Sequence, residues 1–338
     1  GKKSEQAGLA GLFFFGGVSV VLMDGMEAAD APGEGRNELW FHGSPLRLSV
    51  LAAGSTITRR QELAEAFAHK PQTLWCEDDG SIWQNGTQDG WLYRVDAPLE
   101  PGKDIYPHPQ TSMDPGLEWL TCRPLPLTCV KPLPYLDWYL RDPCRASALP
   151  YWKLRAGAYP TGVSVLHSRE LALRGLSPAG AELYFRLIHR LNQVPRAEVP
   201  AGCRLEALPM PGYAQELATM LNAAYPDLQM SREEVLAWTR RPVYAPELWL
   251  GLRDTVSGQL LASGIAEYDA EAREGVLDWV QVLPQARGRG LGKAIVILLL
   301  NQLEGRADFV TVSGKLPEAE AVYRACGFEG KDRWYVFR

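Results

Sequence analysis

The feature that most constrains this fold is a glycine-rich stretch over residues 285–294, which reads Gln-Ala-Arg-Gly-Arg-Gly-Leu-Gly-Lys-Ala. It follows a strand-like apolar run over 276–282 and precedes an unbroken apolar run over 295–300 that predicts a helix. Glycines let the backbone approach a ligand closely, and the N–H groups at a helix start converge on an anion. The order strand, loop, helix therefore predicts an α/β domain with a phosphate-binding loop.

Single residues exclude two common phosphate-binding loops. A Walker A loop needs glycine at position 287 and Ser or Thr at 294, where Arg287 and Ala294 stand. A dinucleotide-binding loop that starts at Gly288 needs a third glycine where Lys293 stands. The sequence over 287–292 instead resembles the pyrophosphate loop of the GNAT N-acetyltransferases, and the alternative is a basic, solvated turn. The resemblance implies acetyl-CoA as co-substrate, bound by Val280, Val282, Arg287, Gly288, Arg289, Gly290, Leu291, Gly292 and Lys293.

The residues around the loop have the element order that this resemblance implies. We expect an α/β (α+β) GNAT domain over 201–338, with a mixed, mostly antiparallel central sheet flanked by helices. Expected strands cover 203–208, 247–252, 260–268, 276–283, 308–312 and 334–337. Expected helices besides the one after the loop cover 213–225, 231–240 and 318–326, with a capping box at Ser231 and a terminating Gly327.

Acetyl transfer to an amine needs a neutral amine, a polarised carbonyl and a protonated leaving thiolate. In the GNAT superfamily the strand before the loop splays from its neighbour, which implies free backbone N–H groups near Val280 and Val282 for the donor. Tyr323 matches the superfamily's tyrosine, four residues before the Gly-Phe pair, and is the expected acid. Asp278 and Glu267 are alternative bases, and a substrate that binds already deprotonated would need neither. A packing tyrosine and ion-paired strand carboxylates are the plain alternatives.

An earlier segment, residues 38–132, resembles the ADP-ribosyltransferase fold, including its poly(ADP-ribose) polymerase branch. A strand-like Leu-Trp-Phe-His-Gly-Ser run is followed by a helical stretch over 60–69 and later strand-like runs over 90–96 and 118–125. This resemblance implies an NAD site made of His42, Gly43 and Glu118, although the family's middle aromatic residue has only Tyr106 as a weak counterpart. The alternative is a strand end whose His-Gly pair has a structural role.

Residues 133–200 are expected to be a linker and helical leader of the acetyltransferase domain. The apolar residues of 183–191 recur near one helical face and predict an amphipathic helix. Trp152 and Lys153 are candidates to line the pocket for the acceptor amine, and ordinary aromatic packing is the alternative.

Residues 1–37 combine an apolar stretch with a linker rich in Gly, Pro and charge. Lys2 and Lys3 precede the apolar run, which is too short for a confident membrane span, and Ala29-Asp-Ala31 resembles a signal-peptidase site followed by an unfavourable Pro32. A signal peptide, a packed accessory segment and an upstream-extended start remain alternatives.

Composition limits the partners. The net charge of −5 gives no electrostatic footprint for nucleic acid, and the six cysteines and five histidines show no metal-ligand spacing. We therefore expect a cytoplasmic enzyme with reduced thiols, no metal and no stable membrane insertion. Its expected partner is a small-molecule or peptide amine, and a homo-oligomer is compatible with the sequence.

Overall fold

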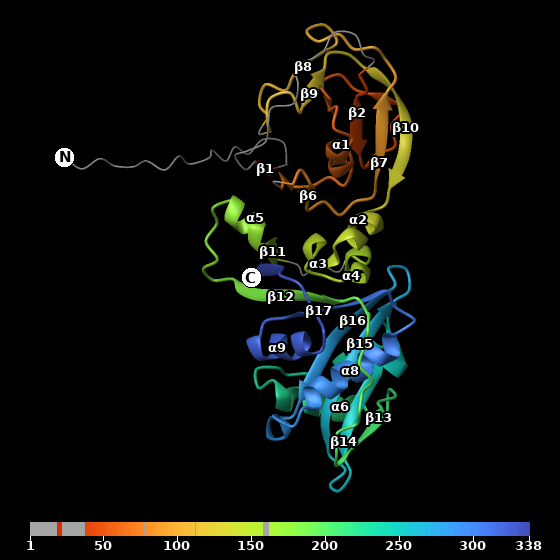
Figure 1. Cartoon of the computed structure of the whole chain (residues 1–338), viewed down its shortest axis with the longest axis vertical. Coiled ribbons are helices and arrows are strands. Elements are labelled where there is room, and N and C mark those ends of the chain that lie inside the picture. Colours follow the sequence, from red (N-terminus) through yellow and green to blue (C-terminus); the bar gives the residue numbers. More distant parts are fainter. Residues whose placement is uncertain (1–18, 22–37, 78, 112, 158–161) are drawn as a thin grey trace, which may run out of the picture. The chain divides into compact units, whose positions relative to one another are not determined.

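The computed structural model describes residues 19–21, 38–77, 79–111, 113–157 and 162–338 (Figure 1). The chain divides into two compact units. The N-terminal unit comprises Gly1–Arg141 and Ala172–Leu176, and the C-terminal unit comprises Asp142–Leu171 and Ser177–Arg338. The predicted signal-like features of residues 1–37 lie outside the described residues, except for the short strand β1 (Ser19–Val21). Within the described ranges, no helix is long and apolar enough to cross a membrane.

The C-terminal unit is built on an eight-stranded sheet with the order β11-β18-β12-β17-β16-β15-β14-β13. Only the pair β16 and β17 is parallel, so the predicted mixed, mostly antiparallel sheet is confirmed. The strands are β11 (Ser164–His167), β12 (Glu182–His189), β13 (Cys203–Ala207), β14 (Trp249–Asp254), β15 (Leu260–Asp269), β16 (Glu274–Val282), β17 (Phe309–Gly314) and β18 (Arg333–Phe337).

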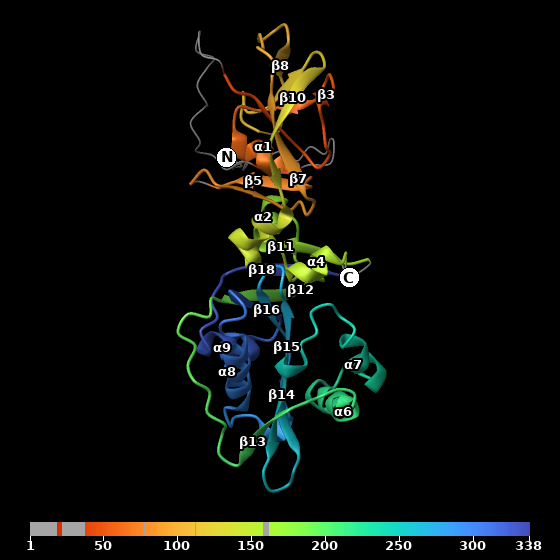
Figure 2. The same ribbon diagram turned by 90° about the vertical axis from the view of Figure 1, so that its right-hand side faces the viewer.

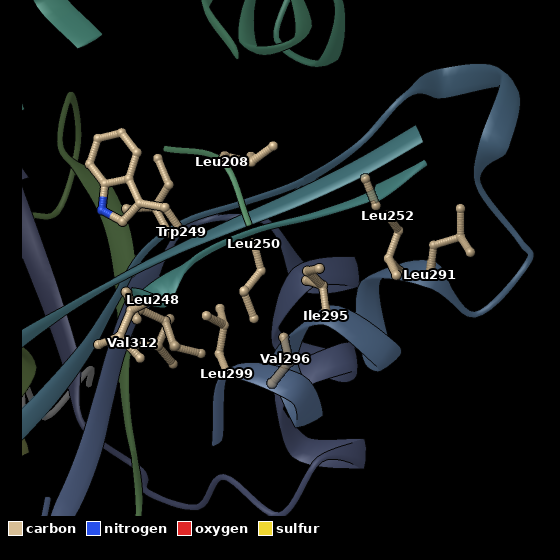
Figure 3. Close-up of a cluster of buried hydrophobic side chains, with 14 of the residues drawn as sticks. Leu208, Leu248, Trp249, Leu250, Leu252, Leu291, Ile295, Val296, Leu299 and Val312 are labelled. Carbon is tan, nitrogen blue, oxygen red and sulfur yellow. The ribbon is translucent and has the colours of Figure 1, made fainter. Parts of the chain in front are cut away.

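Helices cover both faces of this sheet. Figure 2 shows α6 (Ala214–Ala224) and α7 (Arg232–Trp238) on one side, and α8 (Leu291–Leu303) and α9 (Pro317–Ala325) on the other. Apolar side chains hold the layers together: in Figure 3, Leu250 and Leu252 of β14 point towards α8. The remaining elements of the unit are α3 (Pro143–Ala146), α4 (Tyr151–Arg155), η1 (Pro246–Leu248) and η2 (Pro284–Ala286), and α5 (Ser168–Leu173) contains residues of both units.

Local sequence signals explain where several of these elements begin and end. Ser231 and Glu234 form the predicted capping box at the start of α7, each side chain bonding the other residue's backbone N–H. Gly327 follows α9 with φ +94°, a backbone conformation that glycine adopts without steric cost.

The helix predicted over 183–191 is wrong, because the segment forms strand β12. This strand lies between β18 and β17, and its residues Phe185 to His189 are all buried. A strand covered on both faces carries apolar residues without the two-residue alternation of a half-exposed strand. The leucine spacing that resembled a helical face is therefore a consequence of burial on both sides.

The described residues of the N-terminal unit form three small sheets. Their strand orders are β2-β7-β10-β3, β4-β9-β8 and β1-β5-β6. The strands are β2 (Phe41–Ser44), β3 (Val50–Leu51), β4 (Thr56–Ile57), β5 (Thr73–Cys76), β6 (Ile82–Gln84), β7 (Gly90–Val95), β8 (Ile105–Pro107), β9 (Trp119–Thr121) and β10 (Leu125–Leu133). The helices are α1 (Gln61–Ala68), which was predicted, and α2 (Tyr135–Arg141).

Candidate active site

Strand β16 loses one of its two neighbours halfway along its length. It pairs with β15 from Glu274 to Val282, but with β17 only from Glu274 to Leu277. The register with β15 shifts at the same point, because Ile265 faces Trp279 whereas Ala266 faces Leu277. Asp278 is therefore the extra residue of a β-bulge. Within the described residues, no strand pairs with the rest of β16 on its β17 side, which leaves a gap at this edge.

The glycine-rich loop leads from β16 into α8. Gly288 and Gly290 have φ values of +77° and +76°, which side-chain-bearing residues adopt only at a cost. Gly290 is the N-cap of α8, and its carbonyl oxygen accepts the first hydrogen bond of the helix, from the Ala294 N–H. The N–H groups of residues 291–293 thus have no intrahelical carbonyl partner, which is the arrangement that binds anions at helix starts.

A pocket of about 470 Å³ joins the gap to this helix start. It is lined by eight of the nine predicted donor-binding residues: Val280, Val282, Arg287, Gly288, Gly290, Leu291, Gly292 and Lys293. The ninth, Arg289, is exposed and approaches Cys203 instead, with Nη2 3.9 Å from Sγ. Residues at the end of α6 and on α9 also line the pocket, so the loop borders a cavity that several elements enclose.

Tyr323 and Tyr225 both line this pocket. Tyr323, on α9, is 8% exposed, and its ring packs against Phe185 and Phe328. Burial raises the pKa of its phenol well above the ordinary value, so the hydroxyl stays protonated at any working pH. The Tyr225 hydroxyl donates to the Val280 carbonyl at 3.1 Å. Sequence reasoning missed Tyr225, whose only signal was its place at the end of a predicted helix.

The two candidate bases share one cation. Arg241 Nη1 donates to Glu267 Oε1 at 2.5 Å and to Asp278 Oδ2 at 2.7 Å. Trp152 Nε1 donates to the other oxygen of Glu267 at 2.8 Å. Asp278 Oδ1 has, among the described residues, only Lys153 Nζ at 3.8 Å, which is beyond hydrogen-bond distance. Of the four carboxylate oxygens of Glu267 and Asp278, Asp278 Oδ1 is therefore the one without a hydrogen bond among the described residues.

The bulge explains why these groups meet. Consecutive strand residues normally point to opposite faces, yet Asp278 contacts Arg241 while Trp279 stacks on Trp238 of α7 with ring centroids 5.4 Å apart. A bulge places both side chains on the α7 side. Arg241 lies three residues beyond α7, and no sequence motif marks it.

Glu267 is the titratable group of this cluster in the neutral range. Burial raises its pKa to about 7, the negative charge of Asp278 adds to the rise, and Arg241 opposes it. Burial is the main cause because it disfavours the charged carboxylate, and the single guanidinium of Arg241 only partly compensates the two negative charges beside it.

This pKa predicts a pH-dependent stability. The folded protein binds a proton on Glu267 more tightly than the unfolded chain, because the folded-state pKa lies above the ordinary 4.5. The stability that this proton contributes is fully present below pH 4.5 and is lost as the pH rises through about 7. We expect the free energy of unfolding of the wild type, relative to Glu267→Gln, to fall by about 3 kcal/mol over this range. Denaturant titrations of both proteins at several pH values measure the difference, and parallel pH curves would contradict the shift.

The candidate NAD-site residues have separate local partners. His42 Nδ1 lies 2.8 Å from the Thr56 carbonyl oxygen, and burial lowers its pKa. A Cβ on Gly43 would lie 1.7 Å from the Ala64 carbonyl oxygen, so the glycine lets α1 pack on β2. Glu118 accepts a hydrogen bond from Thr111. These contacts give each residue a structural role, and the NAD site stays a prediction.

No group of three or more metal-ligating residues occurs in the described part of the chain.

One family model matches a stretch of the C-terminal unit. Residues 214–328 match the model of the acetyltransferase (GNAT) family. The chain is 32% identical over 93 residues to glucosamine 6-phosphate N-acetyltransferase 1 of Oryza sativa subsp. japonica, a match that covers 26% of this chain and 56% of that protein. The chain thus spans about half the length of this curated relative. Together these matches support a GNAT acetyltransferase-like domain in the C-terminal region.

Solved structures with similar folds have low TM-scores. A GCN5-related N-acetyltransferase from Sphaerobacter thermophilus has a TM-score of 0.44 and 22% identity, covering 54% of this chain and 62% of that chain. An acetyltransferase of the GNAT family from Colwellia psychrerythraea has a TM-score of 0.40 and 14% identity, covering 52% and 64%.

Proposed function

We propose that this chain transfers the acetyl group of acetyl-CoA to a primary amine, which attacks the thioester directly. The observation that carries the proposal is the pocket, because it connects the open start of α8 to the unpaired edge of β16. An anion site and a strand edge without a neighbouring strand in one cavity suit a long ligand with a diphosphate at one end and amide groups along its length.

In this proposal the N–H groups at the start of α8 bind the diphosphate, with Arg287 and Lys293 adding positive charge. The pantetheine arm follows β16 in the place that a neighbouring strand would occupy. Val280 and Val282 provide backbone groups for it, so the arm is held by strand-like hydrogen bonds. The thioester then lies towards the bulge at Asp278.

The proton transfers are assigned from the geometry of the side chains. The base is Asp278, because its Oδ1 is the open oxygen of the pair and its side chain is 16% exposed against 4% for Glu267. Glu267, with both oxygens engaged, sets the local charge that Asp278 experiences. Tyr323 is the acid that protonates the leaving thiolate, and its raised pKa means that the phenol is always available as a donor.

The acceptor is proposed only as a class. The rice relative is a glucosamine 6-phosphate N-acetyltransferase by name, so amino sugars and their phosphates join small alkylamines and peptide N-termini as substrates to test.

The test is calorimetric binding of acetyl-CoA, CoA and NAD to the purified chain, followed by an amine panel with mass detection of the acetylated product. Acetyl-CoA and CoA are expected to bind with similar affinity, since they share the diphosphate and pantetheine. At about 100 times its Kd, either ligand should stabilise the fold by about 2.7 kcal/mol. Absence of acetyl-CoA binding would refute the proposal, and binding without turnover of any amine would indicate a nucleotide sensor.

A further inference from the structure

Lys153 holds a primary amine beside the open oxygen of the proposed base. Its Nζ lies 3.8 Å from Asp278 Oδ1, and 5.4 Å from the centroid of the Trp152 ring. The Lys153 side chain is 25% exposed. At this distance the ion pair is loose, so the ammonium is held near the carboxylate without a hydrogen bond that would fix it.

The backbone under this side chain is firmly anchored. The Tyr151 N–H donates to Glu274 Oε2 at 3.0 Å, and Glu274 is fully buried at the start of β16. Trp152 is 6% exposed and donates to Glu267. The two residues that precede Lys153 in α4 are thus tied to the strands that carry the carboxylates, whereas the end of the lysine side chain has only the loose ion pair with Asp278 and the Trp152 ring beside it among the described residues.

The position of this amine matches what the reaction requires of an acceptor. The attacking amine must lie within hydrogen-bond reach of the base, directly or through one water molecule. Asp278 is two residues from Val280, which lines the pocket, a separation of about 7 Å along a strand. A lysine side chain is long and flexible enough to cover such a distance by rotating about its bonds.

We propose that Lys153 is itself an acetyl acceptor, modified in cis by the acetyl-CoA bound to the same chain. This inference rests on the proposed acetyltransferase function. The lysine ammonium first loses a proton to Asp278 Oδ1, and the neutral Nζ attacks the thioester carbonyl carbon. The carbon–sulfur bond breaks and the thiolate takes a proton from Tyr323. The nitrogen then passes its second proton to water, water returns a proton to the Tyr323 phenolate, and Asp278 releases its proton to solvent. The products are Nε-acetyl-Lys153 and CoA.

The modification changes the charge of the site. An acetylated lysine is neutral, so the Lys153 partner of Asp278 is lost and Arg241 becomes the remaining cation of the cluster. Each chain accepts one acetyl group at this position, after which only an external amine can turn over.

The experiment incubates the full chain with acetyl-CoA and locates acetyl groups by peptide mass spectrometry. We expect one acetyl group on Lys153, at a rate independent of protein concentration and about 100-fold slower in Tyr323→Phe. Lys331, which is exposed, reports non-enzymatic acetylation. Lys153→Arg keeps the charge without a transferable amine, and it is expected to bind acetyl-CoA while acquiring no acetyl group at position 153.

Three results are decisive. If the chain binds acetyl-CoA in the calorimeter but Lys153 gains acetyl no faster than Lys331, the inference fails and the proposed function stands. A rate that rises with protein concentration overturns transfer in cis. If acetyl-CoA does not bind at all, the proposed function fails, and the inference fails with it.

Discussion

Gly290→Asp is expected to raise the Kd for acetyl-CoA at least about 100-fold, because it places a carboxylate at the start of α8. The N–H groups there are proposed to hold the diphosphate, and a charge-assisted hydrogen bond of this kind contributes about 1.5 to 3 kcal/mol. An aspartate beside these groups competes for them and repels the incoming phosphates. Isothermal titration calorimetry with acetyl-CoA measures the loss.

Two matched variants separate the charge from the backbone effect. A Cβ atom at Gly290 would meet no atom within 4 Å, so Gly290→Ala tests only the strain of φ +76°. Gly258 has φ +73° and equally open surroundings in the turn between β14 and β15, so Gly258→Asp adds the same side chain away from the pocket. We expect both to destabilise the fold by about 1 kcal/mol and to bind acetyl-CoA at least tenfold more tightly than Gly290→Asp. Equal binding by all three variants would place the diphosphate elsewhere.

The local sequence was sufficient to predict six of the eight strands of the C-terminal sheet, β13 to β18. Its strands alternate with turns and capped helices, and each signal lies within a short window: the capping box at Ser231, the glycine loop at 288–292, and Gly327 after α9. Such elements form wherever the local preferences and the tertiary packing agree, and here they do.

Long-range pairing decided what the sequence could not predict. Strand β12 looks helical by its leucine spacing, and only its position between β17 and β18 makes it a strand. The bulge at Asp278 depends on a register shift against β15, which the residues of β16 do not reveal. Arg241 lies in a turn without a motif, and its role follows only from the two carboxylates that the sheet brings to it.

The N-terminal unit shows the limit of a short motif. The His-Gly pair suggested a ligand site, yet the missing side chain of Gly43 is already explained by the close approach of α1. A glycine required by packing and one required by a ligand look identical in sequence, because both record only that no Cβ fits. The resemblance of residues 38–132 to ADP-ribosyltransferases therefore remains a prediction.

Tyr323→Phe is expected to lower kcat about 100-fold while the Kd for acetyl-CoA changes by less than about twofold. Phenylalanine keeps the ring contacts with Phe185 and Phe328, so the wall of the pocket should be preserved and only the proton donor is lost. Single-turnover kinetics with saturating acetyl-CoA separate the chemical step from binding.

Tyr335→Phe supplies the control, since it removes a phenol from β18, outside the residues that line the pocket. It is expected to turn over at the wild-type rate. If Tyr323→Phe did the same, the thiolate would leave without help from this residue, and the buried phenol would be a packing group. If instead Tyr323→Phe raised the Kd and left kcat unchanged, the hydroxyl would hold the bound donor equally in the ground state and the transition state rather than act as an acid. The separation of kcat from Kd thus decides between an acid, a binding group and a structural tyrosine at the same position.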